Sequence, residues 1–259
     1  MPGQNLYFAS DFHLGTDGLS ESSQEREKKI VRWLDYIKDD CKTLFLVGDC
    51  FDFWFEFKEV IPKGNIRFLG KLAELRDLGI EIHLFHGNHD MWIKDYFTTE
   101  LGIIIHASYL IFEHNGKRIF ISHGDGLGPG DRKYKILKRV LRNPLNKWLF
   151  ARLHPNFSVK LMRWISQKKG KLGIKQPNYQ GKEKEWLYLF CEKYLKNNDY
   201  VDYFIFGHRH LVIDLLLDNQ KSRYINLGDM ISFNSYAVYK DNSLSVKSFE
   251  NEHLEIITS

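Results

Sequence analysis

The sequence has few cysteines and no long apolar run. Cysteine occurs three times in 259 residues, at Cys41, Cys50 and Cys191, without the close spacing of a metal-binding or redox pair. The odd number, together with an N-terminus that lacks a basic and apolar leader, predicts a protein of the reducing cytoplasm. No run of about 18 apolar residues occurs, which excludes a transmembrane helix.

Acidic residues are scarce in one long segment. Residues 131–196 contain 18 Lys and Arg but four Asp and Glu, a net charge of +14. The whole chain carries +4, so the remainder carries −10. Hydrophobic residues make up 43% of the chain, which is enough for a folded core and excludes a disordered protein. An acidic body with a basic segment indicates that this segment meets an anionic partner.

Apolar runs alternate with amphipathic patterns through the first half of the chain. Strands are predicted at Leu6–Ala9, Thr43–Val47 and Glu81–Phe85, separated by helices at Glu21–Asp39 and Ile66–Leu78. A β-α-β-α-β order indicates a largely parallel sheet with right-handed crossovers.

The second half of the chain adds a second set of strands. Asn115-Gly116 lies between two apolar runs and predicts a hairpin. Five further short strands are expected between Tyr203 and Phe249. We therefore expect a single α/β domain over residues 1–259, a two-sheet β-sandwich flanked by helices. Residues 127–200 break the strand pattern, and we expect them to form a helical cap inserted in that domain.

Five short polar clusters each follow a predicted strand, where ligands gather in α/β folds. They are Asp11-Phe12-His13, Gly48-Asp49-Cys50-Phe51-Asp52, Gly87-Asn88-His89-Asp90, His123-Gly124-Asp125 and Gly207-His208-Arg209-His210. Any one of them is weak evidence, because a strand-end Asp or His often caps a helix. All five in this order indicate a shared site. Asp52 and Asp90 are equally consistent with helix caps and with groups that orient the ligands.

The residue types in these clusters predict a pair of divalent cations. Carboxylate, amide and imidazole ligands together suit Mn, Fe, Zn or Co. A carboxylate such as Asp49 can bridge two cations about 3.5–4 Å apart. Such a pair activates water and neutralises charge on a phosphoryl oxygen, so the clusters predict a phosphoesterase.

The five clusters resemble the pattern of the calcineurin-like metallophosphoesterase superfamily, and the similarity runs from Asp11 to His210. The resemblance implies that Asp11, His13, Asp49 and His210 bind one metal. It implies that Asp49, Asn88, His123 and His208 bind the second metal. His89 would contact the phosphate and protonate the leaving group, and the implied fold agrees with the element order.

Two longer segments are similar to the family of UDP-2,3-diacylglucosamine pyrophosphatases of the lipid A pathway. These are GDCFDFWFE from Gly48 and HGDGLGPGDRKYKILKRVLRNP from His123. The resemblance implies hydrolysis of the glycolipid pyrophosphate to UMP and a diacylated sugar 1-phosphate, with Mn as the preferred metal. It implies substrate contacts from Asn88, His89, Trp54, Asp131, Tyr134 and Arg142. The chain departs from proteobacterial members at His89, where they have Arg.

The cap segment supports a lipid-linked substrate independently of that resemblance. It interleaves aromatic and aliphatic residues such as Trp148 and Phe157 with basic ones such as Arg142 and Lys147. This mixture suits the surface of an anionic inner membrane, although the apolar residues would also serve as the core of a helical hairpin. Arg139 and Arg142 suit bidentate phosphate contacts. No residue pattern indicates the oligomeric state.

Three other functions remain open at this point. The first is a phosphoesterase of the same fold that acts on a soluble nucleotide or phosphodiester. The second is a nuclease or nucleic-acid binder, which the +14 segment allows but which we do not expect, because no nucleic-acid module is present. The third is a scaffold with a degenerate metal site, although none of the seven predicted ligands is missing.

Overall fold

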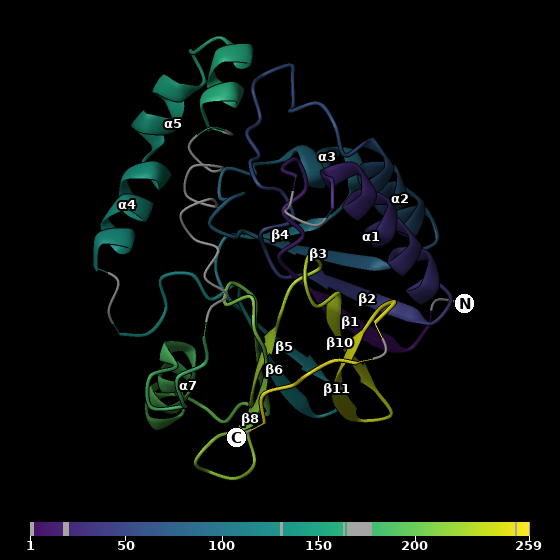
Figure 1. The fold of residues 1–259 in the computed structure, drawn as a ribbon, viewed down its shortest axis with the longest axis vertical. Coiled ribbons are helices and arrows are strands. Elements are labelled where there is room, and N and C mark those ends of the chain that lie inside the picture. Colours follow the sequence, from purple (N-terminus) through teal and green to yellow (C-terminus); the bar gives the residue numbers. More distant parts are fainter. Residues whose placement is uncertain are drawn as a thin grey trace.

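The computed structural model describes residues 3–17, 21–129, 132–162, 164, 178–251 and 253–258. The strands form two sheets, one of six strands and one of five, with helices on both outer faces (Figure 1). The predicted two-sheet sandwich flanked by helices is therefore confirmed. Asp131, which we expected to contact substrate, lies outside the described residues.

The first sheet has the order β11-β10-β1-β2-β3-β4. Its strands are β1 (Asn5–Ala9), β2 (Cys41–Leu46), β3 (Glu81–Phe85), β4 (Ile104–His106), β10 (Ser235–Lys240) and β11 (Ser243–Ser248). β1, β2 and β3 are parallel, as predicted, β4 continues the parallel order, and β10 and β11 add an antiparallel edge.

The second sheet has the order β5-β6-β7-β9-β8. Its strands are β5 (Leu110–His114), β6 (Lys117–Ile121), β7 (Tyr203–Phe206), β8 (Val212–Leu216) and β9 (Arg223–Leu227). β5 and β6 form the predicted hairpin, and β6, β7 and β9 run parallel. The carboxyl ends of β6 and β7 thus lie at one edge of this sheet.

Alternating side chains on the strands build the layers. Leu6 and Phe8 of β1 face the second sheet, whereas Tyr7 and Ala9 face α1 (Ser23–Ile37) and α2 (Ile66–Asp77). Ser22 and Glu25 form a capping box that starts α1, and Trp33 and Leu34 are among the residues that bury its apolar face. The sheets are thereby held face to face with their loops at a common end.

The cap is shorter than we expected. Helices α4 (Arg132–Arg142) and α5 (Pro144–Phe150) project from the body at the upper left of Figure 1. A further helical stretch covers residues 155–162. By contrast, α7 (Trp186–Asn197) packs on the outer face of the second sheet through Leu187 and Cys191. The expected boundary near residue 200 is therefore wrong, because these apolar side chains belong to the body.

An aromatic cluster joins the cap to the body. Phe53, Phe55 and Trp92 of the body pack with Phe150 of α5 and its neighbours. The indole Nε1 of Trp92 also donates to the carbonyl oxygen of Leu141 at 2.9 Å. The two body loops that hold the cap are those that begin with the Asp49 and Asn88 clusters.

The described chain contains two short elements that the sequence pattern did not predict, α3 (Tyr96–Leu101) and β4. Six and three residues are too few to show a periodic pattern. No helix in the described ranges has the length and apolar character needed to cross a bilayer.

Candidate metal centre

All five polar clusters lie at the carboxyl ends of strands, where the two sheets meet. Their loops follow β1, β2, β3, β6 and β7. Five of the seven predicted ligands have a positive φ angle, between 46° and 69°, namely Asp11, His13, Asp49, His208 and His210. Such angles are uncommon for residues other than glycine and cost conformational energy, so the surrounding structure must impose them.

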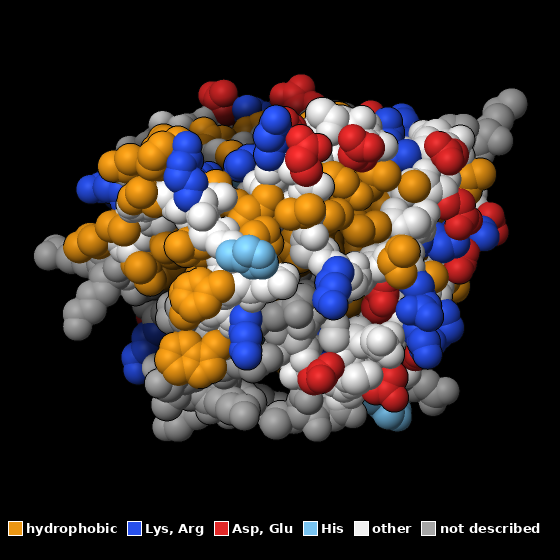
Figure 2. All heavy atoms as spheres, turned by 90° about the horizontal axis from the view of Figure 1, so that it is seen from above, with side chains coloured by type: hydrophobic (Ala, Val, Ile, Leu, Met, Phe, Trp, Pro, Cys, Tyr) orange, Lys and Arg blue, Asp and Glu red, His pale blue; other side chains and the backbone are white. Residues whose placement is uncertain are grey.

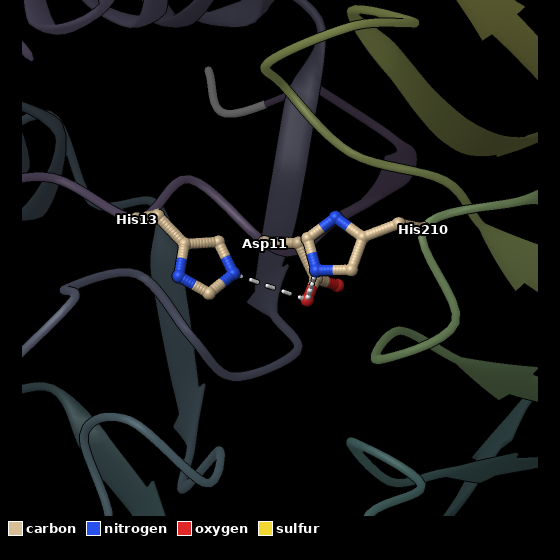
Figure 3. A group of neighbouring side chains, drawn as sticks. All are labelled: Asp11, His13 and His210. Carbon is tan, nitrogen blue, oxygen red and sulfur yellow. Dashed lines mark ion pairs between the residues drawn. The ribbon is translucent and has the colours of Figure 1, made fainter. Parts of the chain in front are cut away.

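One group of donor atoms comes from Asp11, His13 and His210 (Figure 3). Both imidazole rings point toward the Asp11 carboxylate. Nε2 of His13 lies 3.7 Å and Nε2 of His210 lies 3.4 Å from Oδ1 of Asp11. The ligand atoms of this group lie within 4.8 Å of one another, a separation compatible with one cation between them.

A second group comes from Asp49, His123 and His208. Nε2 of His123 lies 3.3 Å from Oδ2 of Asp49 and 3.2 Å from Oδ1 of Asn88. Asp49 also reaches the first group, because its Oδ2 lies 3.8 Å from Nε2 of His13. Its carboxylate therefore stands between the two groups, where a bridging ligand would stand.

The donor set fits divalent cations. Oδ1 of Asp11 and Nε2 of His13 are buried without a hydrogen-bond partner among the described residues. Burying such atoms is unfavourable unless something else satisfies them. Burial and the neighbouring His123 lower the pKa of His208 to about 4, so its ring is neutral, as a metal ligand must be. Two cations would satisfy the buried donors and balance Asp11 and Asp49.

Comparison with known proteins agrees with this geometry. The family described as calcineurin-like phosphoesterase matches residues 5–212. The chain belongs to the calcineurin-like phosphoesterase family. It is 40% identical over 258 residues to the UDP-2,3-diacylglucosamine hydrolase of Porphyromonas gingivalis, covering 95% of this chain and 98% of the relative. The enzyme of the same name from Aeromonas salmonicida is 26% identical, over 89% of this chain and 88% of the relative.

Membership of the calcineurin-like phosphoesterase family makes the chain a metal-dependent hydrolase. Backbone donors fix its carboxylates: His89 N donates to Oδ1 of Asp49 at 2.8 Å, and His208 N donates to Oδ2 of Asp11 at 2.9 Å. A Cβ atom at Gly87 would collide with Asp49, and one at Gly207 with Asp11. Glycine is therefore required at both positions for the loops to approach these carboxylates.

Buried carboxylates outside the ligand set orient this phosphoesterase site. Asp90 accepts hydrogen bonds from the backbone of Gly87 at 2.7 Å and of Cys50 at 2.8 Å, which ties the second and third clusters together. Burial and the nearby Asp49 raise the pKa of Asp90 to about 6. Asp52 lies 3.7 Å from Nδ1 of His13 and 3.2 Å from Nδ1 of His89. Asp90 thus holds two of the loops together, Asp52 contacts the rings of His13 and His89, and neither aspartate is the cap of a helix.

Sequence reasoning missed Asp229. Its Oδ2 lies 2.9 Å from Nδ1 of His210, and its Oδ1 accepts from the backbone N of Ile231 at 3.0 Å. The equivalent nitrogen of His123 lies 2.9 Å from the carbonyl oxygen of Val47. Holding Nδ1 in this way selects the tautomer that presents Nε2 to a cation. Asp229 follows β9 outside all five motifs, so no local signal identified it.

The predicted substrate residues lie in different places. Trp54 is fully buried against Phe51 and Phe97, and its Nε1 donates to Glu56 at 3.0 Å. A buried indole does not reach a substrate, so our expectation for Trp54 is wrong. The residues of the same loop that face the site and the cap are Asp52, Phe53 and Phe55.

Tyr134, Arg139 and Arg142 all lie on α4 of the cap. The hydroxyl of Tyr134 donates to Oδ2 of Asp125 at 2.6 Å, which brings it beside the His123 loop. Arg142 turns toward the body, with Nη1 3.5 Å from the carbonyl oxygen of Ala107. Arg139 is exposed. Tyr134 is therefore tied to the site through Asp125, whereas Arg139 faces solvent.

Proposed function

We propose that the chain hydrolyses the pyrophosphate of UDP-2,3-diacylglucosamine, releasing UMP and 2,3-diacylglucosamine 1-phosphate in lipid A biosynthesis. The observation that carries the proposal is the convergence of two donor groups on Asp49, at the start of a loop that packs against the cap. The similarity to proteins named UDP-2,3-diacylglucosamine hydrolase over almost the whole chain supports this substrate.

The proposed metal ligands are Asp11, His13, Asp49 and His210 for one cation and Asp49, Asn88, His123 and His208 for the other. Manganese is our proposed metal, with zinc or iron as alternatives, because the set mixes oxygen and imidazole donors without thiolate. When bound, the two cations supply charge neutralisation on the phosphoryl group and an activated water.

The protein's own groups position the substrate and move a proton. His89 is the proposed proton donor to the leaving sugar phosphate. Its Nδ1 lies 3.2 Å from Asp52, and this contact orients Nε2 as the donating atom. Tyr134 and Asp131 are proposed to orient the sugar, and Arg142 the phosphates. The Asp49 carboxylate lies between the two donor groups and is proposed to bind both cations, so we expect it to be essential for the reaction.

The cap is proposed to meet the cytoplasmic face of the inner membrane. Large apolar side chains are exposed there, including Ile136 at 61%, Leu145 at 62% and Trp148 at 50%. Seen from above, apolar and basic side chains share this face (Figure 2). Basic residues near an anionic membrane contribute roughly 1 kcal/mol each, and buried apolar residues add to that attraction. We propose a cytoplasmic, peripherally associated protein that does not bind nucleic acid.

The test is a manganese-dependent assay with UDP-2,3-diacylglucosamine in detergent, with a soluble phosphodiester beside it. We expect rapid release of UMP from the glycolipid, abolished by a chelator and by Asp49→Asn. Turnover of the soluble diester alone would discard the lipid substrate and support a soluble-nucleotide phosphoesterase. Salt-dependent binding of DNA would favour the nuclease alternative instead.

A further inference from the structure

A small polar cavity lies beside the metal centre on the side of α7. Its volume is about 250 Å³, and it is lined by Asn178, Gln180, Lys184, Glu185, Trp186 and Arg209. Arg209 is the residue between His208 and His210, so the cavity begins one residue from a proposed ligand of each cation. None of the roles assigned above uses these six side chains.

Hydrogen bonds and a cation–π contact hold the side chains at the floor of the cavity in place. Glu185 is 2% exposed, and its carboxylate accepts hydrogen bonds from Nε and Nη2 of Arg209 at 3.0–3.1 Å. It also accepts a hydrogen bond from the hydroxyl of Tyr224 at 3.3 Å. The Arg209 guanidinium stacks on the Trp186 ring, 4.3 Å from its centroid. Nη1 of Arg209 has no hydrogen-bond partner among the described residues, which leaves a fixed donor at this floor.

The location of the cavity separates it from the lipid side of the site. His89, our proposed proton donor, follows β3 in the first sheet, and Met91 and Trp92, which lie after Asp90 in the same loop, pack against the cap. In the proposed reaction, the leaving sugar phosphate would therefore lie toward the cap. Arg209 follows β7 in the second sheet, next to α7. In the proposed reaction, the part of the substrate that remains on the attacked phosphorus would extend to this other side.

The lining has the chemistry of a nucleobase site. Two side-chain amides, Asn178 and Gln180, each offer a donor and an acceptor, and Lys184 and Arg209 add donors. Uracil presents an acceptor, a donor and an acceptor along one edge, which such amides complement. An acyl chain would find little apolar surface here. The volume is below that of common drug-sized pockets and suits one base with its ribose.

We propose that this cavity holds the uridine of the substrate. The inference rests on the proposed function, because it takes the nucleotide end of the same molecule. Asn178 and Gln180 read the base, the Trp186 indole forms a wall, and Nη1 of Arg209 donates to an oxygen of the nucleoside. The cavity thereby selects the nucleotide, while the cap selects the lipid.

The experiment measures binding of UMP and of inorganic phosphate to the manganese-loaded full chain by calorimetry. Asn178→Ala combined with Gln180→Ala removes two exposed amides without touching the core. Lys182→Ala is the matched control, because Lys182 is exposed on the same segment but bonds Asp218 at 3.3 Å. We expect the double variant to bind UMP about tenfold more weakly, as the loss of two neutral hydrogen bonds implies. Phosphate affinity and the control stay unchanged.

A second variant tests the floor of the cavity. Arg209→Lys keeps a cation beside Glu185 but removes Nη1, so UMP binding weakens while the manganese content, measured by mass spectrometry, stays at two per chain. Equal affinity for UMP and CMP in the unmodified protein, or unchanged UMP affinity in the double variant, overturns the proposal. A parallel loss of phosphate affinity overturns it as well, since the effect would then act through the metals.

The outcomes separate this inference from the proposed function. If the double variant releases UMP from the glycolipid with the normal KM, the proposed uridine site is wrong and the proposed reaction stands. If UMP binding depends on Asn178 and Gln180 but the protein does not hydrolyse the glycolipid, the uridine site stands and the proposed lipid substrate is wrong.

Discussion

Oδ2 of Asp229 lies 2.9 Å from Nδ1 of His210, so a buried carboxylate fixes the ring of a proposed metal ligand. Replacing Asp229 with Asn keeps the shape but removes the charge that selects the tautomer. We expect affinity for one of the two cations to fall about 10–100-fold, with the other unchanged. Calorimetric titration of Mn²⁺ into the metal-free protein measures both sites. Asp214→Asn is the control, because Asp214 pairs with Arg223 on the second sheet, away from the five clusters. An equal loss at both sites would contradict the assignment.

Asp52 faces His13 and His89 together, so its removal should affect a ligand and the proton donor at once. We expect Asp52→Asn to lower kcat about 10–100-fold. A double-mutant cycle with His89→Gln should show strong coupling, because both changes disturb the same proton transfer. The cycle of Asp229→Asn with His89→Gln should be closer to additive. Additivity in the first cycle would show that Asp52 acts on the metal ligand alone.

Metal uptake should release protons. Burial alone would lower the pKa of His123, but the adjoining Asp49 raises it to about 10 in the metal-free protein. The ring is therefore protonated near pH 7.5 and must lose that proton to bind a cation. Metal affinity should rise with pH up to about 10. Titration of Mn²⁺ in two buffers with different ionisation enthalpies measures the proton count; a count of zero would argue against His123 as a ligand.

The aromatic junction should govern the lipid substrate more than the chemistry. Phe150 packs against Phe55 and Trp92 at centroid distances of 4.7 Å. We expect Phe150→Ala to destabilise the cap by about 1–3 kcal/mol. Turnover of UDP-2,3-diacylglucosamine should fall, while turnover of a soluble phosphodiester stays within about twofold of normal. Trp148→Ala, on the exposed side of the same helix, is the comparison for the packing effect. Equal losses on both substrates would show that the cap also shapes the metal centre.

Acid should destabilise the fold through His106. Burial and the neighbouring His83 lower its pKa to about 4, and the two rings are 2.8 Å apart at Nε2 and Nδ1. The folded state thus favours the neutral ring. The stabilisation of the fold that comes from a neutral His106 is complete above the ordinary histidine pKa of about 6.5. It is lost as the pH falls toward 4. When the pH falls from 7.5 to 5, the free energy of unfolding of the unmodified protein should decrease. For His106→Gln that decrease should be smaller by about 1 kcal/mol. Urea unfolding at both pH values provides the measurement.

The five strands that lead into the site were predictable because their apolar runs are continuous and end at polar clusters. The parallel order of the first three strands followed from the intervening helices, and it placed Asp11, Asp49 and Asn88 at one edge. Relationships between segments were not predictable. Asp229 reaches His210 only because β8 and β9 bring distant residues together. In the segment from Phe51 to Phe55 the sequence does not show which aromatic faces the core, so Trp54 was misassigned.

The positive φ angles at Asp11, His13, Asp49, His208 and His210 affect how this site should be dissected. An alanine at any of these positions removes a ligand and leaves a methyl group on a backbone conformation that disfavours it. The measured loss would then mix chemistry with local refolding. Asparagine tolerates left-handed backbone better than alanine does, and glycine has no such penalty. Asparagine at the two carboxylates and glycine at the three histidines would therefore report the lost negative charge or the lost imidazole with the loop left in place.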